Sequence, residues 1–166
     1  MKTSLKKCNF GFEELEALGH IVCGLSLGIY KHKLAAVLLE PLPQNKKEMM
    51  SFLGFSSYYR RCLKYFVILA KSLYRMCDKQ TVFEMTRERI KEYEKINNAL
   101  TEAPLLLMPN WNITFKFYID ACGDGLGAAL HQVQIIYYKP TERLVCYISR
   151  QINPTEARYG ASQMQC

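Results

Sequence analysis

Apolar residues recur at helical spacing in three stretches in the middle of the chain. The first follows Asn45, which can cap a helix together with Glu48 three residues later. A second runs from residue 65 to 76, and a third from 86 to 100, where charged residues fill the outer positions. The predicted apolar sides are Phe52, Phe55, Tyr58 and Tyr59, then Phe66, Leu69, Leu73 and Met76, then Ile90, Tyr93, Ile96 and Leu100.

Shorter apolar runs lie on either side of these helices. Residues 7–34 are typical of short strands and turns, because Gly24 and Gly28 interrupt the apolar stretch 21–30 and favour a hairpin or meander over a helix. Residues 37–40 form a short apolar stretch, and Pro41 and Pro43 then make a rigid entry to the first helix.

Strand-like patterns follow Pro104. Residues 113–119 are rich in β-branched and aromatic side chains, and Asp120 is expected to close this strand before a turn over residues 121–125 that includes Asp124. Further strands are predicted at 126–136 and 144–149, which gives an antiparallel meander, and a helix is predicted to begin near Ala161. The predicted fold class is therefore α+β: a β-hairpin, then helices, then a meander.

Positive charge is concentrated in the first half of the chain. The 166 residues carry a net charge of +7, and hydrophobic residues make up 49%, enough for a packed core. Residues 1–83 contain 13 Lys and Arg against 6 Asp and Glu, whereas residues 84–166 contain 9 of each kind. This distribution indicates that the first half contacts a polyanion, although a solvated basic surface would give the same counts.

The seven cysteines and three histidines lack the spacing of a zinc site or a disulfide framework. No secretory signal is visible, and no apolar run reaches the ~18 residues of a membrane span. We therefore expect reduced thiols, no membrane partner, and an intracellular protein of the cytoplasm or nucleus.

Eight short motifs resemble, in the same order, the Pol polyprotein of gypsy-class LTR retrotransposons. Together they extend over essentially the whole chain. They are Lys7-Cys8-x-Phe10 with Leu18-Gly19-His20-Ile21-Val22; Pro41-x-Pro43; Lys47-Glu48-x-x-Ser51-Phe52-Leu53-Gly54; Tyr58-Tyr59-Arg60; Ile68-x-Ala70-x-x-Leu73; Ala103-Pro104-Leu105-Leu106; Asp120-Ala121 with Gly125-Leu126-Gly127-Ala128-Ala129-Leu130; and Tyr147-x-Ser149-Arg150 with Glu156-x-x-Tyr159.

This resemblance implies a division of the chain into three segments. Residues 1–40 would be the end of the reverse transcriptase palm, with strands and turns. Residues 41–104 would be the thumb and connection helices, and residues 105–166 a truncated RNase H-like domain. A three-stranded sheet would leave one face bare, or covered by the helix at 86–100. Its exposed edge would be prone to self-association.

The resemblance also implies contacts to nucleic acid. Thumb helices of this family hold the primer–template through its backbone, so cations in this part of the chain are candidates for phosphate contacts. The nucleic acid would be an RNA–DNA hybrid or a duplex, held without sequence preference. Either of the two candidate tyrosines can instead pack between helices. The candidate residues are Lys46, Lys47, Tyr58, Tyr59, Arg60, Arg61 and Lys64.

Asp120 matches the first of about four carboxylates that hold two Mg²⁺ ions in RNase H-type nucleases. Gln165 stands where this family has its second carboxylate, a Glu, and a neutral amide is a weaker ligand. One carboxylate alone makes a poor, incomplete Mg²⁺ site, so tight binding is not expected. The polymerase signature, an adjacent Asp pair, is absent from the sequence, whose aspartates are Asp78, Asp120 and Asp124.

Three functional hypotheses stay open on these grounds, so the sequence leaves it undecided whether the chain is an enzyme. The first is a reverse transcriptase/RNase H-like piece of a retroelement that catalyses neither reaction alone. The second is a non-catalytic module that binds nucleic acid or protein through its basic thumb. The third is one part of a working enzyme, against which Gln165 argues.

Overall fold

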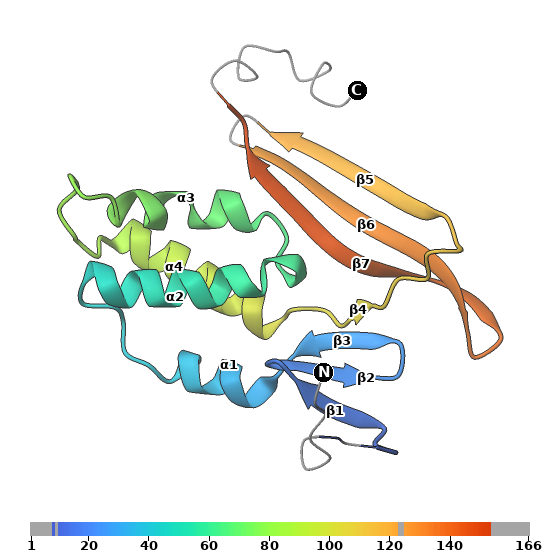
Figure 1. The fold of residues 1–166 in the computed structure, drawn as a ribbon. Coiled ribbons are helices and arrows are strands. Elements are labelled where there is room, and N and C mark those ends of the chain that lie inside the picture. The colour runs from blue at the N-terminus through green and yellow to red at the C-terminus, as the bar shows by residue number, and fades with distance from the viewer. Residues whose placement is uncertain (1–7, 9, 123–124, 154–166) are drawn as a thin grey trace, which may run out of the picture.

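Two small antiparallel sheets lie at one end of a group of helices in the computed structural model, which describes residues 8, 10–122 and 125–153 (Figure 1). The first sheet has the strand order β1-β2-β3-β4 and the second has the order β5-β6-β7. This mixture of helices and antiparallel sheet confirms the α+β prediction. In chain order the elements are β1 (Glu14–Ala17), β2 (His20–Cys23), β3 (Ser26–Ile29), α1 (Lys31–Leu38), α2 (Lys46–Tyr58), the 3-10 helix η2 (Arg60–Cys62), α3 (Phe66–Met76), α4 (Arg87–Thr101), β4 (Leu106–Leu107), β5 (Phe115–Cys122), β6 (Gly125–Ile136) and β7 (Lys139–Gln151).

Helix α2 begins with the capping arrangement that the sequence predicts. The Asn45 side chain accepts a 3.0 Å hydrogen bond from the backbone N–H of Glu48. The Glu48 carboxylate in turn accepts from the Asn45 side-chain amide at 2.6 Å and from the backbone N–H of Gln44 at 2.7 Å. These bonds satisfy N–H groups that have no partner inside the helix, and they fix where α2 starts.

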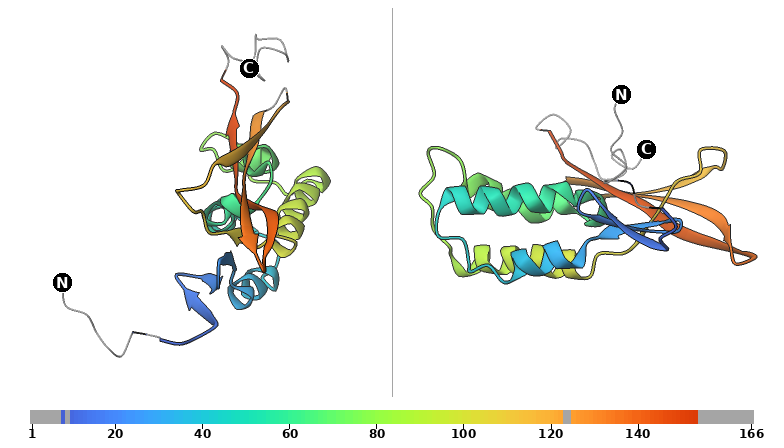
Figure 2. Two further views of the ribbon diagram at one scale, coloured as in Figure 1. Left: turned by 90° about the vertical axis from the view of Figure 1, so that its right-hand side faces the viewer. Right: turned by 60° about the horizontal axis from the view of Figure 1, so that its bottom comes forward.

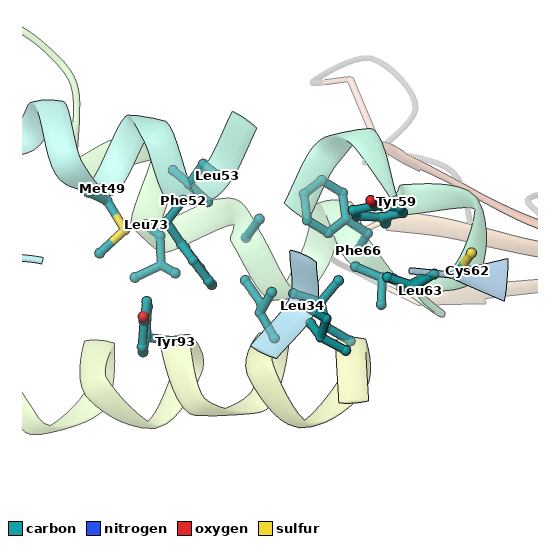
Figure 3. Packing of buried hydrophobic residues seen from close by; sticks show 14 of the residues in the cluster. Leu34, Met49, Phe52, Leu53, Tyr59, Cys62, Leu63, Phe66, Leu73 and Tyr93 are labelled. Carbon is teal, nitrogen blue, oxygen red and sulfur yellow. The ribbon is translucent and has the colours of Figure 1, made fainter. Parts of the chain in front are cut away.

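The main hydrophobic core lies between α2, α3 and α4, the three predicted helices (Figure 3). Met49, Leu73 and Ile96 are fully buried, one from each helix. The rings of Phe52 and Tyr93 meet with centroids 4.3 Å apart. Each side chain of this size contributes roughly 1.5–3 kcal/mol on burial, so this core is the main source of stability that positions the rest of the molecule.

The first sheet contains the predicted hairpin, but the residues that follow it correct one expectation. Strands β2 and β3 pair antiparallel, as the glycine-broken stretch 21–30 predicts. Residues 31–38, however, form helix α1 instead of strands and turns, because Ala35, Ala36 and their neighbours are good helix formers and only Leu34 needs to be buried. Strand β4 pairs with β3, so residues 106–107 complete the sheet of the first segment.

The second sheet is longer than predicted. Asp120 does not close β5, because the pairing with β6 continues through Ala121 and Cys122, and β6 begins at Gly125. Strand β7 runs from Lys139 to Gln151, well beyond the predicted 144–149. The meander itself is confirmed. The helix expected near Ala161, together with Asp124, Glu156 and Gln165, lies outside the described residues.

The helices contact the second sheet through η2 and the start of α3 (Figures 1 and 2). The sequence leaves two alternatives for this sheet, a bare face or a face covered by the helix at 86–100. The second does not hold, since α4 packs chiefly on α3 in the helical core. Apolar side chains of the sheet stay half-exposed, among them Phe117, Ile119 and Ile148. No described helix combines the length and the apolar character needed to span a membrane.

Candidate nucleic-acid interface and carboxylate site

The candidate basic residues fall into two groups at opposite ends of α2. Lys46 and Lys47 open this helix of 13 residues, whereas Arg60, Arg61 and Lys64 follow its end. At a rise of 1.5 Å per residue the two ends lie about 20 Å apart. The structure therefore does not bring the five predicted cations together in one patch.

Lys46 has a structural partner. Its ammonium donates to the backbone carbonyl of Asp78 at 2.5 Å and to that of Lys79 at 3.5 Å. These carbonyls follow the end of α3, where a cation is favourable because the helix dipole places negative partial charge there. Lys46 thus joins the start of α2 to the end of α3, while Lys47 stays exposed beside Glu48.

The second group forms what we term the basic seam, defined as Arg60, Arg61 and Lys64. All three side chains are exposed, between the helices and the second sheet. Arg60 and Arg61 line a cavity of about 540 Å³ together with the exposed Trp111. Burial raises the pKa of the Cys146 thiol on the wall of this cavity, and the nearby charge of Arg61 acts in the opposite direction. In the part of the chain that the structure describes, none of the three cations forms an ion pair.

The two candidate tyrosines have different environments. Tyr59 is buried in the core, and its hydroxyl donates a 2.7 Å hydrogen bond to the carbonyl of Gly19. Tyr58 is 52% exposed, with its ring stacked on His20 at a centroid distance of 5.2 Å. The Tyr59 ring is enclosed by protein, so this residue packs between elements. The expectation that Tyr59 contacts nucleic acid at the surface is therefore corrected. Tyr58 keeps a surface from which it can contact a ligand.

Asp120 is exposed near the end of β5, beside a smaller cavity of about 130 Å³. The hydroxyl of Tyr65 donates a hydrogen bond to its Oδ2 atom. The Lys64 ammonium lies 4.9 Å from the centroid of the Tyr65 ring. Across the described residues, no group of three or more His, Cys, Asp or Glu side chains is placed to hold a metal ion. The described residues around Asp120 therefore do not by themselves fit the pair of Mg²⁺ ions that its sequence motif implies, since a hard cation needs several oxygens that converge on it.

Sequence reasoning missed Tyr65 as the partner of Asp120. A signal was present in Gly127, because a glycine inside a strand often marks the close approach of another group. Here a Cβ atom on Gly127 would overlap the Tyr65 ring. The sequence gives no indication of which group approaches, since Tyr65 lies 55 residues before Asp120.

A second polar cluster on the same sheet was also missed. The Glu142 carboxylate accepts from the ammonium of Lys116 at 2.5 Å and from the hydroxyl of Tyr118 at 2.7 Å. The hydrogen bond from Lys116 and then that from Tyr118 lower the pKa of Glu142, and the same contacts raise the pKa of both partners. His131 lies 3.5 Å from this carboxylate. The members of this cluster lie on β5, β6 and β7, so the cluster ties the three strands together. It holds one carboxylate among donors.

Both the sequence and the fold of this chain are similar to those of known proteins. Residues 85–166 match the family model described as the RNase H-like domain found in reverse transcriptase. The whole fold is similar to the foamy viral protease-reverse transcriptase in complex with an RNA/DNA hybrid, with a TM-score of 0.81 at 20% identity over 98% of this chain and 22% of that chain. A complex of the same viral protein with dsDNA gives a TM-score of 0.80 over 96% of this chain and 33% of that chain. Residues 85–166 are therefore similar to the RNase H-like domain found in reverse transcriptase, and the whole fold is similar to that of the viral protein.

Its relatives are Pol polyproteins of transposons and retroviruses. The Pol polyprotein from transposon 297 of Drosophila melanogaster is 30% identical over 166 residues, which cover 99% of this chain and 15% of the relative. The transposon 412 polyprotein of the same species is 27% identical over 99% of this chain and 13% of the relative. The Gag-Pol polyprotein of feline leukemia virus is 28% identical over 92% of this chain and 9% of the relative. The chain thus spans less than a fifth of the length of these relatives.

Proposed function

We propose that this chain is the thumb-and-connection part of a gypsy-class LTR retrotransposon Pol polyprotein, joined to the beginning of its RNase H-like domain. In this proposal residues 1–40 close the palm, residues 41–104 are the thumb and connection, and residues 105–166 belong to the RNase H-like domain. Its function is to hold duplex nucleic acid or an RNA–DNA hybrid, in the cytoplasm or the nucleus. The observation that carries the proposal is the basic seam, three exposed cations without carboxylate partners among the described residues.

The chemistry of the basic seam suits a phosphate backbone. Arg60 and Arg61 can each donate two parallel hydrogen bonds to phosphate oxygens, and Lys64 adds a point charge beside them. Tyr58, 52% exposed, lies two residues before Arg60 and offers an aromatic edge to the same ligand. Such contacts read no bases, so binding should be independent of sequence and sensitive to salt. The viral structures of similar fold are complexes with dsDNA and with an RNA/DNA hybrid, which supports this ligand class.

We also propose that the residues of this chain catalyse neither polymerisation nor hybrid cleavage by themselves. Asp120 stands alone among the described carboxylates, and its surroundings are a phenol and an ammonium. The sequence holds no adjacent Asp pair, and Gln165 replaces the expected Glu. A cleavage assay on an RNA–DNA hybrid with Mg²⁺ tests this point. Cleavage that is lost on Asp120→Asn would contradict it.

A salt titration tests the proposed binding. Binding of a fluorescent hybrid duplex is measured by anisotropy over a range of salt concentrations, for the wild-type chain and for the variant Arg60→Gln/Arg61→Gln/Lys64→Gln. We expect the slope of log affinity against log salt to become shallower by about 0.9 for each phosphate that the variant no longer neutralises, hence by roughly 2 to 3.

A charge-matched variant on α4 provides the control. Arg87→Gln/Lys91→Gln/Lys95→Gln also removes three exposed positive charges, all from helix α4 and none from the basic seam. We expect it to keep the wild-type slope. Equal slopes for all three proteins would show that the basic seam is not the binding site, and absence of binding at low salt would remove the nucleic-acid proposal altogether.

A second proposed property is self-association through β5. This strand lies at the edge of the second sheet, so its outer N–H and C=O groups have no neighbouring strand in that sheet. Phe117 and Ile119 beside this edge are about half exposed. Sedimentation velocity at increasing protein concentration tests it. A change of Tyr118 to Pro, which removes a backbone donor of β5, should reduce association, and a monomer at all concentrations would exclude it.

A further inference from the structure

The start of α3 rests on the end of the second sheet at two glycines of β6. The Tyr65 ring covers Gly127, where an added Cβ atom would overlap the ring. One helical turn further on, Ile68 covers Gly125, where a Cβ atom would lie 2.9 Å from its Cγ1 atom. Both strand positions therefore have to be glycine for the helix to come this close.

The sheet also supplies a cap that the helix itself lacks. No side chain next to α3 in sequence caps its first turn. The backbone N–H of Val67 instead donates a 3.2 Å hydrogen bond to the hydroxyl of Ser149 on β7. A first-turn N–H has no partner inside a helix, so this bond links the beginning of α3 to the sheet.

Tyr65 adopts a conformation that is unfavourable for a residue with a side chain. Its φ angle is +56°, in the left-handed region. A non-glycine residue there costs roughly 1–2 kcal/mol, which neighbouring contacts have to offset. The contacts of this side chain include the packing on Gly127, the hydrogen bond to Asp120 and the Lys64 ammonium beside the ring.

We propose that Asp120 in this chain serves as the acceptor of a latch that fastens the helical part to the second sheet, instead of holding a metal ion. We define the Tyr65 latch as Tyr65, Gly127 and Asp120. The phenol hydroxyl donates to one of the two carboxylate oxygens of Asp120, and the described surroundings add no second carboxylate with which a metal ion could be shared. Tyr65 and Asp120 thus act as a positioning pair, which goes beyond the proposed binding of nucleic acid.

A double-mutant cycle on the full chain tests the latch. Urea unfolding is measured for the wild type, Tyr65→Phe, Asp120→Ala and the double variant. Tyr65→Phe keeps the ring on Gly127 and removes only the hydroxyl, so the fold should survive. We expect each single change to raise the unfolding equilibrium constant about fivefold, and the double change to raise it no further than one single change. Additive effects would overturn the latch.

Tyr118→Phe provides the matched control on the same strand. The Tyr118 hydroxyl bonds to Glu142 and shares no hydrogen bond with Asp120. The effect of Tyr118→Phe should therefore add to that of Asp120→Ala. A hydrogen-exchange experiment gives an independent readout, because the Val67 amide is bonded to Ser149 across the same junction. We expect Tyr65→Phe to speed exchange of this amide several-fold while the amides inside α4 keep their rates. An unchanged rate at Val67 would count against the latch.

Magnesium separates the latch from a metal site. Added Mg²⁺ should leave the unfolding midpoint of both the wild type and Tyr65→Phe unchanged. An Mg²⁺-dependent stabilisation of the wild type that Asp120→Ala abolishes would assign Asp120 to a metal and overturn the latch. Because the latch is measured by unfolding and exchange, its failure would leave the salt-dependent binding at the basic seam untouched, and the reverse also holds.

Discussion

The hydroxyl of Tyr59 donates a 2.7 Å hydrogen bond to the carbonyl of Gly19, 40 residues earlier in the chain. This bond joins the end of α2 to the turn between β1 and β2, and the same carbonyl also accepts from the backbone N–H of Tyr30 at 3.2 Å. Tyr59 therefore holds the first sheet against the helices. The basic seam begins at the next residue, so this contact also fixes where the proposed binding surface lies.

Removal of this bond should affect stability and leave binding unchanged. We expect Tyr59→Phe to lower the free energy of unfolding by about 1 kcal/mol, because a buried hydroxyl bond is removed while the ring still fills its space. The salt slope of duplex binding should stay at the wild-type value. Urea unfolding and the anisotropy titration measure the two quantities, and a shallower slope in Tyr59→Phe would return this residue to the interface.

Substitutions of the two lysines at the start of α2 should have different effects on stability. Lys46→Met removes the bonds to the carbonyls of Asp78 and Lys79, so we expect a loss of about 0.5–1 kcal/mol in the free energy of unfolding. Lys47→Met changes a nearby exposed side chain and should be neutral within about 0.5 kcal/mol. Equal unfolding curves for the two variants would show that the Lys46 contact contributes nothing.

The sequence predicts the helical part well because its signals are local. The apolar spacing locates α2, α3 and α4, and Asn45 with Glu48 marks the start of α2. Helix α1 is missed, since a short helix that buries only Leu34 leaves almost no periodic pattern. The site is predicted less well. The contact of Tyr65 with Asp120 and that of Tyr59 with Gly19 depend on how distant elements pack, which no local pattern encodes.

The turn between β6 and β7 contains two residues in an unfavourable conformation. Tyr137 and Tyr138 have φ angles of +49° and +64°, and both side chains are almost fully exposed. Two-residue hairpin turns with positive φ at both positions favour Asn-Gly. We therefore expect Tyr137→Asn/Tyr138→Gly to raise the free energy of unfolding by about 1–2 kcal/mol. Thermal unfolding measures this, and a lower melting temperature would mean that the two tyrosines make contacts that outweigh the strain.

The buried thiol of Cys62 should make stability depend on pH in the alkaline range. Burial raises the pKa of Cys62 from 9.0 to about 11. As the pH rises, the unfolded chain therefore loses the Cys62 proton at a lower pH than the folded chain does. The contribution of the protonated thiol to the free energy of unfolding is complete below pH 9 and is lost as the pH rises toward 11. We expect the contribution to amount to about 1–2 kcal/mol. It is measured as the difference in the free energy of unfolding between the wild type and Cys62→Ala at each pH.

Thiol labelling of the native protein provides the control for that experiment. Cys62 is 3% exposed, whereas Cys23 at the end of β2 lies at the surface. At neutral pH a small alkylating reagent should modify Cys23 within the time in which Cys62 stays unmodified, as mass spectrometry of the digested chain would show. Rapid modification of Cys62 in the native state, or a difference between wild type and Cys62→Ala that stays constant from pH 8 to about 11, would show that this thiol is not enclosed by the junction of η2 with the core.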